Sequence, residues 1–229
     1  MESNRSNRIP ELPSLSDGVY LLEIESVRGP LHTLVLDHIL TTRGPAYWID
    51  THGHATTQPL ARLAPDPHVL DRICVARGFT AFQHYALTET LSTVVNSTAS
   101  LIVCPAIDGL YRADGLREDD RQAMLVRALA MLSAVAREYD LSVMLTRTRE
   151  DTFSEPVANA AGDLIKCEQT RLGPRFYSGG FETLVYPLGN GQLQTTLAFW
   201  MRILEARQPV YDAAQVGPQS SEVPANGSY

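Results

Sequence analysis

Lysine is almost absent from this chain of 229 residues. Of its 19 lysines and arginines only Lys166 is a lysine, and 26 acidic residues bring the formal net charge to −7. A charge of this sign argues against a protein that grips nucleic acid through bulk positive charge, although a local basic patch stays open. An arginine bias fits a GC-rich genome, and an acidic, lysine-poor surface fits a salty cytoplasm. Composition does not separate these two causes.

Cysteines and long apolar runs are also scarce. The three cysteines, Cys74, Cys104 and Cys167, form no C-x-x-C pair, and Met1–Arg8 carries no secretory apolar core. This pattern predicts reduced thiols in the cytoplasm. Nowhere does an uncharged apolar run reach the length that a membrane span needs. We therefore expect a soluble cytoplasmic protein that does not contact a membrane.

Short apolar segments alternate with helical ones over the first 146 residues. Five segments are rich in strand formers, and four others carry the helical spacing of apolar residues. This alternation implies right-handed crossovers and predicts an α/β fold with a mostly parallel sheet and helices on both faces. The expected strands are 19–25, 46–50, 71–76, 100–104 and 141–145, and the expected helices are 31–40, 56–63, 79–95 and 119–138.

The two longest helical segments each have a candidate buried face. In 119–138 this face is an apolar stripe of Leu125, Leu129, Leu132 and Val135. In 79–95 the residues closest to one face are Phe82, Leu87, Leu91, Val94 and Val95.

The pattern changes after about residue 146, where a loop and shorter strands follow. Asn190-Gly191 lies between 184–188 and 192–199, which is typical of a hairpin and predicts an antiparallel C-terminal pair. We expect a flexible lead-in over 1–17 and one core domain over 18–205. Residues 206–229 are rich in Gly, Pro, Ser and Gln, so we expect a disordered tail there.

Several local strings carry a family resemblance in the right order and spacing. They are Trp48–Thr51 (WIDT), Val75–Phe79 (VARGF), Leu101–Val103 followed by Leu110–Ala113 (LYRA), Ala136–Leu141 (AREYDL) and Val143–Thr146 (VMLT). Over about residues 18–205 the chain resembles the ATPase core of the RecA/RadA recombinase family, and the archaeal RadB-like paralogues in particular. The resemblance implies a RecA-like P-loop NTPase fold, an archaeal source and a role in DNA recombination or repair.

The phosphate-binding loop of that family is degenerate in this chain. A P-loop, G-x-x-x-x-G-K-[ST], needs glycines so that backbone N–H groups can close around phosphate, and a lysine that reaches the outer phosphates. Ser26 stands at the first glycine, Leu31 at the second and His32 at the lysine, while Thr33 alone matches. Pro30 also removes one N–H donor from the loop.

Three further positions lack the side chains that the resemblance implies for catalysis. Cys104 stands at the metal-holding aspartate, His52 at the glutamate that activates water, and Thr148 near the phosphate-sensing glutamine. Phosphoryl transfer depends on positioning and charge neutralisation, so we expect a pseudo-ATPase without a cofactor. Arg28 and His32, on either side of Gly29, leave weak non-hydrolytic nucleotide binding open.

A competing motif is Asp50-Thr51-His52-Gly53-His54. It looks like the D-x-H-x-H that opens some metal-dependent hydrolase sites, where two imidazoles share one face of a strand end. Those enzymes need a closed barrel with further ligands on later strands, and no histidine follows His84. We expect no metal site, with His52 and His54 as weak candidates and a metal-dependent hydrolase as the alternative function.

The resemblance places DNA contacts after the fifth strand, where charges of both signs mix. The basic residues of this region are Arg147, Arg149, Lys166, Arg171 and Arg175, and the acidic ones are Glu150, Asp151, Glu155, Asp163 and Glu168. Arg171–Tyr177 mixes guanidinium groups with aromatic rings, as a single-strand stacking site does. The leading hypothesis is a non-catalytic accessory protein that binds a RecA-like recombinase or other repair and replication proteins. Weak binding of single-stranded DNA is a further alternative.

Overall fold

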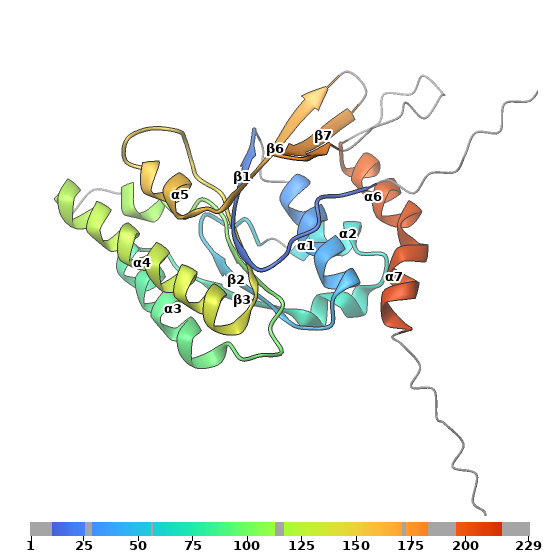
Figure 1. Ribbon diagram of the computed structural model, residues 1–229, viewed down its shortest axis with the longest axis horizontal. Helices are drawn as coiled ribbons and strands as arrows, with labels where there is room; N and C mark the ends of the chain where they lie inside the picture. The colour runs from blue at the N-terminus through green and yellow to red at the C-terminus, as the bar shows by residue number, and fades with distance from the viewer. Residues whose placement is uncertain are drawn as a thin grey trace, which may run out of the picture.

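One mixed sheet organises the chain. The computed structural model describes residues 11–25, 29–55, 57–112, 117–170, 173–182 and 196–216. In these residues the strand order is β3-β2-β4-β5-β1-β6-β7-β8 (Figure 1). Strands β1 to β6 pair in parallel, and β6-β7 and β7-β8 are antiparallel. The strands are β1 (Gly18–Ile24), β2 (Ala46–Asp50), β3 (Ile73–Arg77), β4 (Leu101–Cys104), β5 (Ser142–Leu145), β6 (Asp163–Thr170), β7 (Gly173–Ser178) and β8 (Phe181–Glu182).

Helices cover both faces of the sheet. In Figure 1, α1, α2, α6 and α7 lie on one side, and α3, α4 and α5 lie on the other. The helices are α1 (Pro30–Thr41), α2 (Thr57–Leu63), α3 (Ala81–Val94), α4 (Glu118–Tyr139), α5 (Glu155–Ala160), α6 (Thr196–Ala206) and α7 (Gln208–Gln215), with 3-10 helices η1 (Pro67–Arg72) and η2 (Leu110–Arg112).

The central strands are apolar because both of their faces are covered. Along β4, Leu101 and Val103 join the cluster under α1, while Ile102 and Cys104 join the cluster under α3 and α4. All four side chains are fully buried. The predicted α/β fold with a mostly parallel sheet is therefore confirmed.

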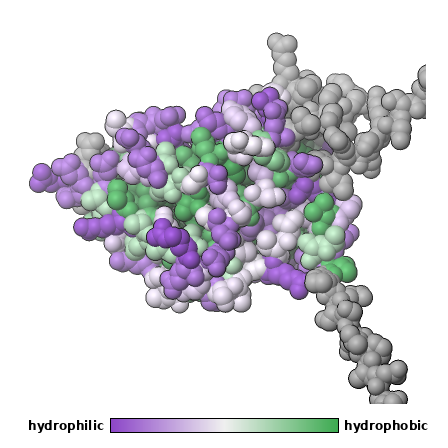
Figure 2. Space-filling model, viewed as in Figure 1, coloured by the Kyte–Doolittle hydropathy of each residue, from purple (hydrophilic) through white to green (hydrophobic). Residues whose placement is uncertain are grey.

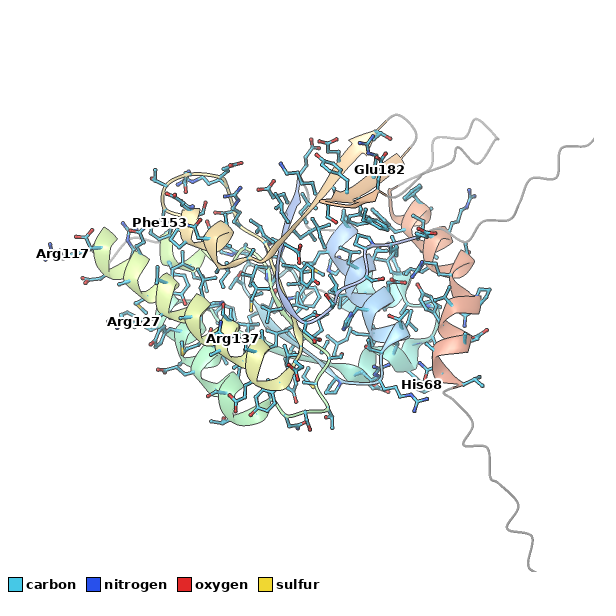
Figure 3. All side chains as sticks on the ribbon, viewed as in Figure 1. His68, Arg117, Arg127, Arg137, Phe153 and Glu182 are labelled. Carbon is cyan, nitrogen blue, oxygen red and sulfur yellow. The ribbon has the colours of Figure 1, made fainter. Side chains whose placement is uncertain are left out.

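The outer surfaces of the helices are charged or mixed. Arg127 and Arg137 project from the exposed side of α4 (Figure 3). Hydrophilic residues cover much of the face seen in Figure 2, and hydrophobic residues show between them. No helix in the described parts of the chain is both long enough and apolar enough to cross a bilayer.

The predicted buried stripe of α4 is confirmed, whereas that of α3 is partly wrong. Helix α3 buries its small and polar residues Ala81, His84 and Thr88 together with Leu91, and exposes Phe82 (61%) and Val94 (45%). The reason is that α3 packs beside α4 on the sheet, so its inward face is set by the fit against α4.

A C-terminal antiparallel pair is present, as predicted. Strands β6 and β7 form it, with Glu168 opposite Arg175. The turn predicted at Asn190-Gly191 falls among residues that the structure does not describe. Residues 183–195 lie outside the described residues, and from Thr196 the chain is the helix α6, so the predicted strand over 192–199 is wrong at its end. Alternating apolar residues there fit a helix face as well, because Trp200, Ile203 and Leu204 pack into the core.

The tail and the lead-in are more ordered than expected where they are described. Helix α7 continues the chain past residue 206 and buries Tyr211, and a buried ion pair ties it to α1 through Arg207 and Asp37. At the other end, Leu12 is 3% exposed and packs into the core. Residues 1–10 and 217–229 lie outside the described residues.

Candidate functional site: the position of the phosphate-binding loop

Helix α1 begins directly after β1, at the edge of the sheet where β1, β2, β4 and β5 end. Gly29 precedes the helix with φ 97°, a conformation that favours glycine, and Pro30 occupies its first position. Proline has the right φ there but offers no N–H to a ligand. Ser26 and Arg28 lie outside the described residues.

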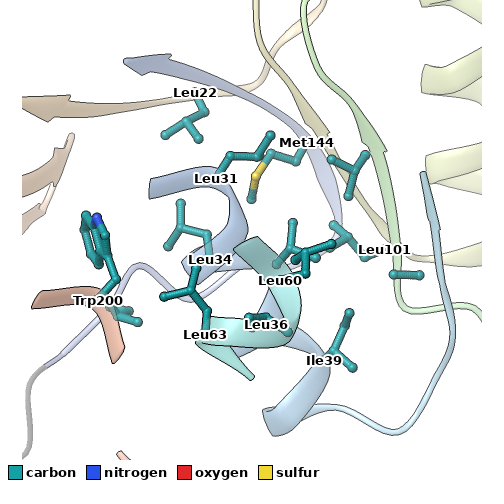
Figure 4. Packing of buried hydrophobic residues seen from close by; sticks show 14 of the residues in the cluster. Leu22, Leu31, Leu34, Leu36, Ile39, Leu60, Leu63, Leu101, Met144 and Trp200 are labelled. Atoms are coloured by element: carbon teal, nitrogen blue, oxygen red, sulfur yellow. The ribbon is translucent and has the colours of Figure 1, made fainter. Parts of the chain in front are cut away.

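Leu31, at the position of the second P-loop glycine, is a core residue. Its side chain is fully buried and lies near Met144 of β5 in the cluster beneath α1 (Figure 4). Burial of a leucine stabilises a fold by about 2 kcal/mol. A bulky, buried side chain therefore stands at the position where a working loop has glycine.

His32, at the position of the P-loop lysine, is turned into the protein. It is fully buried, and its ring stacks on Trp48 with the centroids 5.7 Å apart. Nε2 lies 2.9 Å from the carbonyl oxygen of His54, and Nδ1 accepts from the Gly29 amide at 3.4 Å. Because Nδ1 accepts from this amide, Nε2–H is the donor to the His54 carbonyl oxygen.

Thr33 matches the P-loop hydroxyl by residue type only. The side chain is fully buried in the first turn of α1, and among the described residues its Oγ1 has no hydrogen-bond partner.

Cys104 lies at the end of β4 in the cluster covered by α3 and α4. Complete burial raises the pKa of its thiol to about 12. A neutral thiol in this environment supplies neither the charge nor the oxygen ligand that magnesium prefers. It therefore does not replace the metal-holding carboxylate.

The polar residues at the end of β2 form hydrogen bonds with neighbouring segments of the protein. Asp50 accepts from the Ala55 amide and from Arg77, and Thr51 donates to the Pro105 carbonyl oxygen at 2.7 Å. His52 has φ 58° and lies against Gly109, where a Cβ would come 2.5 Å from its ring. These contacts explain the polar residues at this turn as internal structure.

The geometry around His52 and His54 does not support the hydrolase alternative. The two rings are 6.3 Å apart at their centroids, and no three His, Cys, Asp or Glu side chains gather into a metal-holding group within the described residues. The sheet is also open in its strand order, whereas that type of site is built on a closed barrel.

Asp108 and Arg112 form an ion pair at this edge that sequence reasoning missed. Asp108 is fully buried, and its carboxylate accepts from Arg112 and from both the amide and the hydroxyl of Thr148. Arg112 also binds both carboxylate oxygens of Asp151. The only signal in the sequence was an Asp-Arg spacing of four residues.

Two of the cations expected to contact DNA, Arg147 and Lys166, are paired with carboxylates. Arg147 binds Glu23 and lies 3.2 Å from Glu150, and Lys166 lies 3.2 Å from Glu23. The hydrogen bond with Glu23 raises the pKa of Lys166. These residues line two shallow hollows of about 330 and 540 Å³ beside the end of β1 and the first part of β6. The pairing leaves little free positive charge for a phosphate backbone.

Arg175 lies on β7, 3.4 Å from Glu182 and over the ring of Tyr177. Arg171 lies outside the described residues, so the expected stacking site is described only in part.

Comparison with known proteins agrees with the topology. The Rad51 family model matches residues 33–167. The chain is also 24% identical, over 179 residues, to the DNA repair and recombination protein RadB of Pyrococcus abyssi, a match that covers 70% of this chain and 77% of the relative. Because the family model covers more than half of the chain, the protein belongs to the Rad51 family and carries its RecA-like core.

Proposed function

We propose that this protein is a non-catalytic member of the Rad51 family that acts in DNA recombination or repair by binding protein partners. Membership of the family and the similarity to a protein named RadB support a role in DNA recombination or repair. The partners that fit this role are a RecA-like recombinase and other repair or replication proteins.

The proposed loss of catalysis rests on one observation, the burial and hydrogen bonding of His32. A phosphate-binding lysine must be a cation that projects toward solvent, whereas this imidazole is buried, hydrogen-bonded to two backbone groups and stacked on Trp48. Leu31 and Cys104 support the same conclusion, because both are fully buried in apolar clusters. The protein binds no nucleotide in its working state.

A partner surface is offered by β3 and the start of α3. Strand β3 is the edge of the sheet in the described part of the chain, and Val75 on it is 47% exposed. Phe79 and Phe82, 71% and 61% exposed, follow directly. An uncovered strand edge beside exposed aromatic rings is suited to an extended apolar segment of a partner, which would add a strand to the sheet.

Affinity capture tests this proposal. The tagged full chain is expressed in the cells of its source, and the proteins that it retains are identified with and without enzymatic removal of ATP. We expect a recombinase, repair or replication protein to be retained in both conditions. Capture of no such protein, or capture only in the presence of ATP, would contradict the proposal.

A pair of variants locates the surface. Phe79→Ser with Phe82→Ser is expected to abolish retention, because it removes both exposed rings. Leu164→Thr on β6, a change of another exposed apolar residue to a strand former, serves as the control and is expected to retain the partner. Equal loss of partner retention in the Phe79/Phe82 variant and in the Leu164 variant would show that the β3 surface does not bind the partner.

A further inference from the structure

Two loops meet at the edge of the sheet. The β4 loop, residues 105–109, follows β4, and the β5 loop, residues 146–154, follows β5. Backbone groups already join them, because the Ile107 amide donates to the Thr146 carbonyl oxygen and the Ala106 amide donates to Thr146 Oγ1. These bonds extend the pairing of β4 with β5 by about one residue.

Beyond this point the two loops are held together by charge. Both carboxylate oxygens of Asp108 bind the β5 loop, through the Thr148 amide at 2.7 Å and the Thr148 hydroxyl at 2.6 Å. The Asp108 side chain is fully buried, so these bonds are shielded from water. A charged acceptor buried in this way would be costly if its donors moved away.

Arg112 bridges Asp108 and Asp151, and so links the β4 loop to the β5 loop a second time. Its Nε donates to Asp108 at 2.6 Å, and its two terminal nitrogens donate to Asp151 at 2.7 and 2.8 Å. The guanidinium lies 4.7 Å from the centre of the Phe153 ring, and Figure 3 places Phe153 just before α5. The hydrogen bond from Arg112 lowers the pKa of Asp151 well below its usual value, as expected of a bidentate pair.

We propose that Asp108 and Arg112 act as a latch that keeps the β5 loop in one arrangement without any ligand. Each charge in the latch is supplied by the chain, and the donors to both carboxylates come from Arg112 in η2 and from the β5 loop. Thr148 and Arg149 belong to the held loop, and Arg149 adds a further contact to Asp151 at 2.9 Å. This inference goes beyond the proposed function, because the latch can exist whether or not a nucleotide binds elsewhere.

Hydrogen exchange of the full chain, followed amide by amide, tests the latch. In the unmodified protein the Thr148 amide is expected to be protected. Asp108→Asn keeps the size of the side chain but removes its charge, so exchange at Thr148 is expected to accelerate about tenfold. The amides of β4 should stay within about twofold of their original rates.

Two more variants keep the test decisive. Thr148→Val removes only the hydroxyl bond of an exposed residue, so it folds even if Asp108→Asn does not, and we expect a few-fold acceleration at the same amide. Asp50→Asn removes a comparable buried carboxylate that binds Arg77 and the Ala55 amide. It is expected to accelerate exchange at Ala55 and to leave Thr148 unchanged.

An unprotected Thr148 amide in the unmodified protein would overturn the latch. So would equal acceleration at Thr148 and throughout β4, because that pattern reports global unfolding. The same measurement with magnesium and ATP separates the two proposals. If ATP slows exchange at Thr148, the non-catalytic function fails, while the variants still report on the latch.

Discussion

The imidazole of His32 lies on the indole of Trp48, with the rings inclined by 23°. The two residues come from α1 and β2, so the contact joins the start of the helix to the sheet at the position where the family binds phosphate. Both side chains are buried. We propose that the contact closes this position, and the consequences of that proposal can be measured.

Restoring a lysine at this position should damage the protein. His32→Lys places an ammonium group in a buried space beside the His54 carbonyl oxygen, and we expect it to lower the free energy of unfolding by roughly 2–4 kcal/mol without creating nucleotide binding. His32→Gln is the matched control, because its amide can accept from Gly29 and donate to His54. Urea denaturation of the two variants measures the difference, and a lysine variant as stable as the glutamine one would be inconsistent with a closed position.

The last described helix should be part of the folded core. Arg207 and Tyr211 both bind the buried carboxylate of Asp37 on α1. Arg207→Met leaves that carboxylate without its cation, so we expect a loss of about 3–5 kcal/mol, and less than the sum of the single effects when it is combined with Asp37→Asn. Arg202→Met, on the exposed side of α6, is expected to change stability little. Additive effects of the two core variants would argue against a direct pair.

Stability should fall in mild acid because of His84. Burial lowers the pKa of this imidazole from 6.5 to about 4. Above pH 6.5 the imidazole is neutral in both the folded and the unfolded protein. Between pH 6.5 and 4 it is protonated in the unfolded chain but stays neutral in the folded protein. The free energy of unfolding therefore decreases across this range, by up to about 3 kcal/mol from this group.

Chemical denaturation at a series of pH values tests this dependence. His84→Gln is expected to flatten the profile only in part, because burial also lowers the pKa of His38 and acts in the same direction. The exposed His68 offers a control, and His68→Gln should leave the slope as it was. An identical slope in the His84 variant would show that this residue does not carry the effect.

The fold was predictable because its strands are short, apolar and regularly spaced. The stripe from Leu125 to Val135 on α4 follows one helical period and is buried as predicted. The face of α3 was not predictable in the same way, since Phe82 and Leu91 are equally apolar in the sequence. Only the packing of α3 against α4 decides which of them is buried.

Residue type alone predicts that Leu31, His32 and Cys104 are unsuited to phosphate and metal binding, but it does not indicate what these side chains contact instead. The pairing of Asp108 with Thr148, 40 residues apart, depends on how two loops turn after neighbouring strands. The tail was misjudged because its composition is polar, whereas Arg207 and Tyr211 are held by one carboxylate that lies about 170 residues earlier.

Whether His32 and its neighbours exclude a nucleotide can be tested by calorimetric titration of the full chain with a non-hydrolysable ATP analogue and magnesium. We expect no saturable heat up to millimolar ligand, which corresponds to a binding free energy weaker than about −4 kcal/mol. Saturable binding with a micromolar dissociation constant would contradict this expectation.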